Sequence, residues 1–74
     1  MTREAAEAAR QRLLARMDHE IATHEAAVAY QEDAARHAKA SGHADTAQRA
    51  RERARTAANR LAQARKERDE AQSA

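Results

Sequence analysis

The residues best able to do chemistry lie close together in the first half of the chain, at His19, Glu20 and His24. Zinc-binding helices place two histidines four residues apart, so that both face one ion. Here the histidines are five residues apart, which turns them about 140° from each other on a helix. Glu20 and His24 share a face but supply only two ligands. We therefore expect no metal site within one chain, and metal binding only if a symmetric second chain adds ligands.

No other arrangement of residues in the sequence is typical of catalysis. There is no cysteine, which excludes disulfides and thiolate chemistry. Paired acids beside a pocket and an activated nucleophile are also missing, and the single glycine, Gly42, forms no phosphate-binding loop. We expect a protein that is not an enzyme and that uses no cofactor.

The second half of the chain is rich in arginine, most densely over residues 49–55. Alternation by two scatters most of these side chains around a helix, and only Arg49, Arg53 and Arg60 form a rough stripe. Charge alone is enough for phosphate binding, but this half has no aromatic residue on which bases could stack. Nucleic-acid binding through these three arginines is one interpretation, and solvated flanks of a coiled coil are the other.

The elements that would position these residues are two long helices. The chain has no proline, Thr2 is suited to cap a first helix, and Ser41 with Gly42 forms the one strong stop signal. The sequence predicts a single all-α domain over residues 1–74, with a helix over about 3–40, a turn at 41–43 and a helix over about 44–72.

Apolar and small residues recur at alternating steps of three and four in both predicted helices, the spacing of a left-handed coiled coil. We call these positions the seam. They are Leu14, Met17, Ile21, His24, Val28, Gln31, Ala35 and Ala38 in the first helix, and Ala47, Ala50, Ala54, Ala57, Leu61, Ala64, Arg68 and Ala71 in the second.

An antiparallel pairing places seam residues opposite each other when their numbers add to 85, as Val28 and Ala57 do. Large residues of the first helix then meet small residues of the second. The same alignment predicts two ion pairs, Asp18 with Arg65 and Glu32 with Arg51. His24 becomes a candidate pH-sensitive seam residue, because protonating it inside the seam would cost stability.

A hairpin of this composition can bury only a small apolar surface. Alanine fills 23 positions, and the large apolar residues are Met1, Leu13, Leu14, Met17, Ile21, Val28, Tyr30 and Leu61. Leu13 has no bulky partner within the hairpin. We therefore expect a homodimer that forms a four-helix bundle, with interface candidates Leu13, Met17, Glu20, Ala27 and Ala34. Tyr30, the one aromatic residue, is either simply exposed or an anchor for a partner.

The segment from Gly42 to Ala47 resembles the inter-helix turn of tetratricopeptide repeats. The two-helix plan resembles the topology of the plasmid RNA-binding Rop hairpin, which implies a bundle that binds nucleic acid. No family is identified from either likeness. The leading hypothesis is a small adaptor module that binds a protein partner by coiled-coil association, and the alternative is a nucleic-acid-binding bundle. The sequence lacks an apolar run of the ~20 residues that cross a bilayer and a hydrophobic leader, so we expect a cytoplasmic location without membrane contact.

Overall fold

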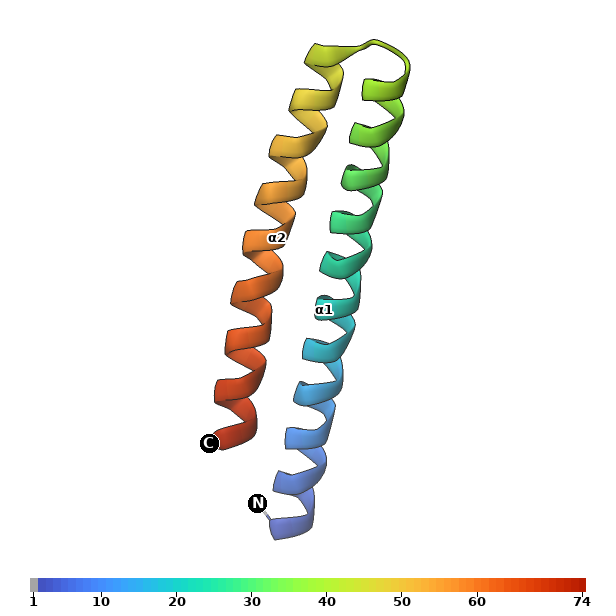
Figure 1. Cartoon of the computed structure of the whole chain (residues 1–74). Helices are drawn as coiled ribbons and strands as arrows, with labels where there is room; N and C mark the ends of the chain where they lie inside the picture. Colours follow the sequence, from blue (N-terminus) through green and yellow to red (C-terminus); the bar gives the residue numbers. More distant parts are fainter. Residues whose placement is uncertain (1) are drawn as a thin grey trace.

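The computed structural model describes residues 2–74 and shows a hairpin of two α-helices. Helix α1 spans Arg3–Ala40 and helix α2 spans Ala44–Ser73. The helices lie antiparallel and side by side, both termini are at the same end, and α1 reaches beyond the end of α2 (Figure 1). The predicted all-α hairpin is confirmed. Met1, counted above among the large apolar residues, lies outside the described residues.

Helix α1 begins at a side-chain cap. The hydroxyl oxygen of Thr2 accepts a hydrogen bond from the backbone N–H of Ala5 at 3.0 Å. Glu4 lies in the first turn, where the helix dipole favours a negative charge. The cap satisfies one of the backbone N–H groups that the first turn leaves without a partner, so the sequence itself fixes where α1 starts.

The turn between the helices depends on the conformation of Gly42. The φ angle of this residue is +77°, in the left-handed region that glycine adopts without strain. The N–H of His43 donates to the carbonyl of Ala38 at 2.8 Å, and the N–H of Gly42 donates to that of Lys39 at 3.1 Å. This pair of bonds is the Schellman motif, which ends α1 by satisfying its last carbonyls.

The core follows the predicted seam. The buried residues are Leu14, Ala35, Ala38, Ala47, Ala50, Ala54, Ala57, Leu61 and Ala64, and all of them are seam positions. The other seam residues are half-buried, including Met17, His24 and Arg68. Because most of the core is alanine, the two backbones can pack closely while burying little apolar surface per residue.

Two predicted ion pairs between the helices are wrong. Nε of Arg68 lies 2.9 Å from Oδ1 of Asp18, and Nη2 of Arg65 lies 3.4 Å from Oε2 of Glu25. Side chains on a helix lean toward its N-terminus. Arg65 therefore leans toward the turn, where it pairs with Glu25, and Asp18 pairs with Arg68 instead.

The second predicted ion pair, between Glu32 and Arg51, does not form either. Both residues border one shallow hollow, but no ion pair joins them among residues 2–74. The two cross-helix ion pairs and the hydrogen bond from Arg10 to the carbonyl of Gln72 join residues whose numbers add to 86, 90 and 82. These sums lie on both sides of 85, so the contacts agree with the antiparallel alignment of the seam.

The hairpin is long and thin, with extents of 60 × 14 × 12 Å. Its radius of gyration is 17.4 Å, whereas a compact domain of this length would have about 11 Å. Its accessible surface is 5741 Å², whereas a compact monomer of 8.2 kDa would expose about 4,500 Å². The chain therefore exposes roughly 1,200 Å² more than its mass requires.

Candidate interaction surface: an arginine-lined groove beside the seam

One long side of the hairpin carries an open groove between α1 and α2, with a volume of about 560 Å³. We call it the arginine groove. Its lining residues are Ala27 and Gln31 from α1, and Arg49, Glu52, Arg53, Thr56, Ala57 and Arg60 from α2. Ala57 is buried, and Ala27 and Gln31 are half-buried, so these three residues form the floor, and the α2 wall is polar and mostly basic.

Helical spacing explains why three arginines meet here. Arg53 and Arg60 are seven residues apart, which is close to two turns, and Arg49 precedes Arg53 by one turn. The three arginines that the sequence singled out for phosphate binding therefore line one groove. Sequence reasoning missed Thr56, although its distance of seven residues from Arg49 was a signal that both lie on the same face.

The two long edges of the hairpin differ in charge. On the edge away from the groove, Asp18 and Glu25 of α1 form ion pairs with Arg68 and Arg65 of α2, respectively. The hydrogen bond to Asp18 is the main cause that raises the pKa of Arg68, against a smaller opposing effect of desolvation. On the groove side α1 instead places Ala27 opposite the arginines. The acids of α1 thus neutralise arginines on one edge, whereas no α1 carboxylate among the described residues lies against the basic wall of the groove.

The groove arginines have few partners of their own. Nη2 of Arg49 donates to Oγ1 of Thr46 at 3.3 Å. Neither Arg53 nor Arg60 takes part in an ion pair within the part of the chain that the structure describes. Their guanidinium groups therefore keep donors that an anionic partner could use.

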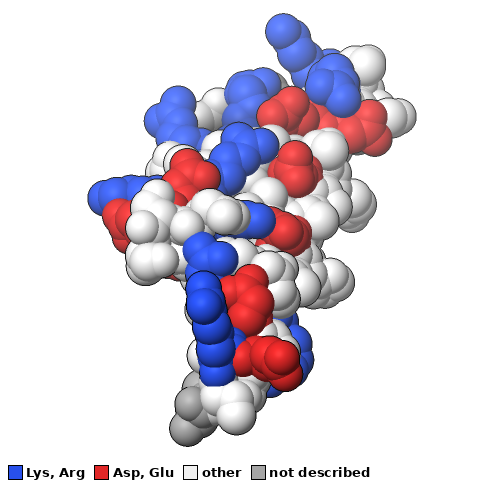
Figure 2. Space-filling view, turned by 90° about the horizontal axis from the view of Figure 1, so that it is seen from below, with Lys and Arg blue, Asp and Glu red and all other residues white. Residues whose placement is uncertain are grey.

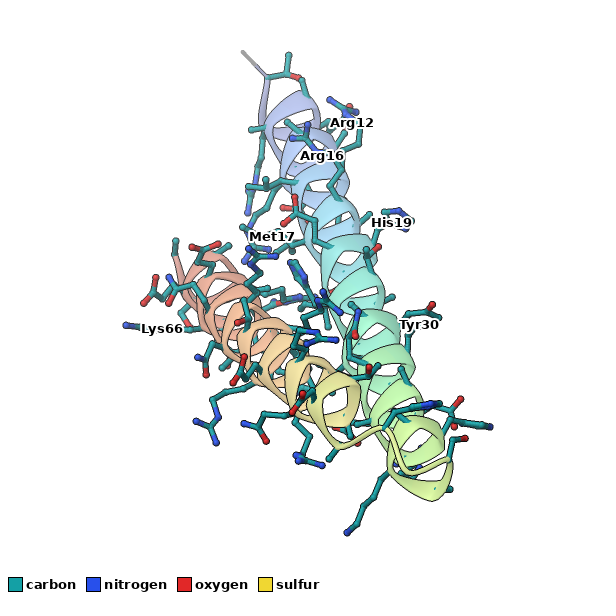
Figure 3. All side chains as sticks on the ribbon, turned by 90° about the horizontal axis from the view of Figure 1, so that it is seen from above. Arg12, Arg16, Met17, His19, Tyr30 and Lys66 are labelled. Atoms are coloured by element: carbon teal, nitrogen blue, oxygen red, sulfur yellow. The ribbon has the colours of Figure 1, made fainter. Side chains whose placement is uncertain are left out.

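The predicted dimer contacts lie along this same side. Leu13, Glu20, Ala27 and Ala34 follow one another at steps of seven along α1, and Ala27 lines the groove itself. Leu13 is 39% exposed, a large fraction for a leucine beside a core. Met17 is half-buried in the seam and projects toward α2 (Figure 3). The residues proposed for dimerisation and those proposed for nucleic acid thus share one side of the molecule.

Two further candidates lie elsewhere. Tyr30 is 71% exposed and, like His19, it projects from the side of α1 that faces away from α2 (Figure 3). His24 is half-buried at the seam. No group of three or more metal-ligating side chains occurs among residues 2–74, and the structure brings no third ligand to His24 and Glu20.

The charges of the surface are mixed. Seen from the end that carries both termini, basic and acidic side chains alternate with uncharged surface between them (Figure 2). Neither helix of the described chain has a stretch that is both long and apolar enough to cross a membrane. Comparison with protein-family models, with curated proteins and with solved structures finds no match for this chain.

Proposed function

We propose that this chain is a small, non-catalytic interaction module that acts by coiled-coil association of its helices with another protein chain. The observation that carries this proposal is the thin core of the hairpin. Among residues 2–74, nine side chains are buried; Leu14 and Leu61 are the only large ones, and the other seven are alanines. A chain this short has a folding free energy near zero when about 25 cal/mol per Å² of apolar burial is set against about 1.5 kcal/mol per ordered residue. Added helices would supply the missing burial.

The exposed area supports a homodimer as the simplest form of such a bundle. The excess of roughly 1,200 Å² per chain would correspond to about 2,400 Å² buried in a pair of chains. That area falls within the range of obligate dimers, which runs from about 2,000 Å² upward. The groove side, with Leu13, Ala27 and Ala34, is the surface that a four-helix bundle would cover.

Sedimentation equilibrium tests the association directly. We expect a particle of twice the 8.2 kDa chain mass at micromolar concentrations. Leu13→Glu should shift the equilibrium toward monomer without a loss of helical circular dichroism, because Leu13 contacts the partner more than its own hairpin. A chain that stays monomeric at these concentrations would overturn the proposal.

Nucleic-acid binding is a second candidate, because Arg49, Arg53 and Arg60 line one groove. Three phosphate contacts on duplex DNA would give a slope of roughly −2.7 in a plot of log affinity against log salt. Replacing the three arginines by glutamine should remove the binding. Glu52 in the same groove and the mixed charges of Figure 2 weigh against this function. If no salt-sensitive gel shift occurs at low ionic strength, this candidate is excluded.

A further inference from the structure

The groove side of the hairpin carries its charges in two blocks. The basic block, nearer the turn, is Arg49, Arg53 and Arg60. The acidic block, nearer the open end, follows from the spacing of three exposed residues. Glu67 lies seven residues after Arg60, Glu70 lies three residues after Glu67, and Glu20 lies seven residues before Ala27. Steps of seven and three return to nearly the same helix face, so the acids continue the line of the arginines.

Neither block is neutralised within the chain. None of the six residues forms an ion pair among the described residues. The hydrogen bonds recorded for them are local contacts with uncharged side chains, from Arg49 to Thr46 and from Gln63 to Glu67. The opposite edge differs, because there Asp18 and Glu25 are paired with arginines. The charges without an ion pair among residues 2–74 are therefore mainly positive toward the turn, where Glu52 lies among the arginines, and mainly negative toward the open end, where Arg16 lies beside Glu20.

We propose that the occupant of the arginine groove is a second copy of this chain, docked with its turn at the opposite end. This inference rests on the proposed function and specifies its geometry. A two-fold axis would cross the hairpin near Leu61, midway between the blocks. Arg49 and Arg53 of each copy would then face Glu67 and Glu70 of the other, as an isologous contact requires, whereas Arg60 would lie at the axis beside its own counterpart.

The length of the helices agrees with this axis. The middle of α1 lies near Ile21, which the seam alignment places opposite Ala64, within one turn of Leu61. An axis chosen from the charges therefore also lets the two copies of α1 overlap along nearly their whole length. Docking with both turns at the same end would instead place arginine against arginine and glutamate against glutamate, and such contacts between like charges are unfavourable.

A second copy of the chain would bring opposite charges to both blocks at once. Phosphates would satisfy Arg49, Arg53 and Arg60 but would meet repulsion from Glu20, Glu67 and Glu70. A purely acidic helix would meet the same repulsion at the open end. Self-complementary charge is the property expected of a surface that binds its own copy.

Charge reversal tests the pairing. Arg49→Glu with Arg53→Glu should weaken dimerisation at least about tenfold, and so should Glu67→Arg with Glu70→Arg, because each places like charges in contact. Combining all four substitutions in one chain should restore the dimer, since the two blocks have then exchanged signs. Arg55→Glu with Lys66→Glu is the matched control. It reverses two positive charges on the outer side of α2, where Lys66 points away from α1 (Figure 3), and should leave dimerisation nearly unchanged.

The orientation is tested by a distance. The chain has no cysteine, so Ser41→Cys gives a single spin label at the turn. Electron-spin distance measurements should find the two turns about 50 Å apart, from 1.5 Å of rise per residue on both sides of the axis. A separation below about 20 Å, or a fourfold variant that fails to dimerise while its circular dichroism stays helical, would refute this geometry but leave the proposed function intact. A wild-type chain that is monomeric would overturn both.

Discussion

Replacing Ala50 by leucine should destabilise the hairpin, because the seam has no room for the larger side chain. Ala50 is 3% exposed, and Ala35, which the seam alignment places opposite it, is 7% exposed. Leucine adds three carbon atoms between two closely packed helices. Overpacking of this kind typically costs about 1–3 kcal/mol. A domain of this size loses about 4–8 °C of melting temperature per kcal/mol, so we expect Tm to fall by roughly 5–20 °C.

Thermal melts followed by far-ultraviolet circular dichroism would measure the effect at matched protein concentrations. Ala62→Leu is the control, because it makes the same change on an exposed face of α2 and should move stability by less than about 0.5 kcal/mol. If Ala50→Leu melts at or above the wild-type temperature, the seam contains an unfilled space there. If Ala62→Leu is equally harmful, the loss does not come from close packing between the helices. Either result would refute the reasoning.

Three further changes test other parts of the fold. Leu61→Ala should lower the free energy of unfolding by about 2–3 kcal/mol in urea titrations, whereas Leu13→Ala, at an exposed leucine, should cost far less at concentrations where the chain is monomeric. Gly42→Ala should cost about 1 kcal/mol in thermal melts despite the open space around it, because alanine is strained at a φ of +77°. A Gly42→Ala chain as stable as the wild type would show that the turn can relax. Thr2→Ala should cost about 1 kcal/mol through loss of the first-turn cap, and a melt unchanged from wild type would mean that the end of α1 is frayed in solution.

The fold could be predicted because its signals are local. Thr2 caps, Gly42 ends a helix, and steps of three and four residues define a seam; each depends on residues close in sequence. The ion pairs could not be predicted as well, because they depend on where long side chains reach. The seam alignment placed Asp18 near Arg65, but the lean of α2 side chains toward the turn brings Arg65 to Glu25.

The candidate surface could be predicted only in part from the sequence. Spacing was sufficient to group Arg49, Arg53 and Arg60, since all three belong to one helix. That Ala27 of α1 lies beside them follows only when both helices are placed together. The sequence therefore led to two separate predictions, one set of residues for dimerisation and another for phosphate binding. The structure puts both sets on one side of the hairpin. Spacing alone also places Glu67 and Glu70 on the line of the arginines, although neither residue belongs to a motif.

The contrast between an alanine seam and charged flanks has a physical reason. Within one chain, the turn of residues 41–43 fixes how the helices align, because so short a connection cannot absorb a slip of a whole heptad. Interchangeable alanines are then sufficient for the seam. Between two chains no covalent link sets the alignment, and a surface of Leu13, Ala27 and Ala34 would allow several registers with similar burial. Charge blocks of opposite sign remove that ambiguity, because sliding one chain by the distance between the blocks would bring like charges together. Where the turn already sets the register, specific charges are not needed in the core, and the groove side is where they would have an effect.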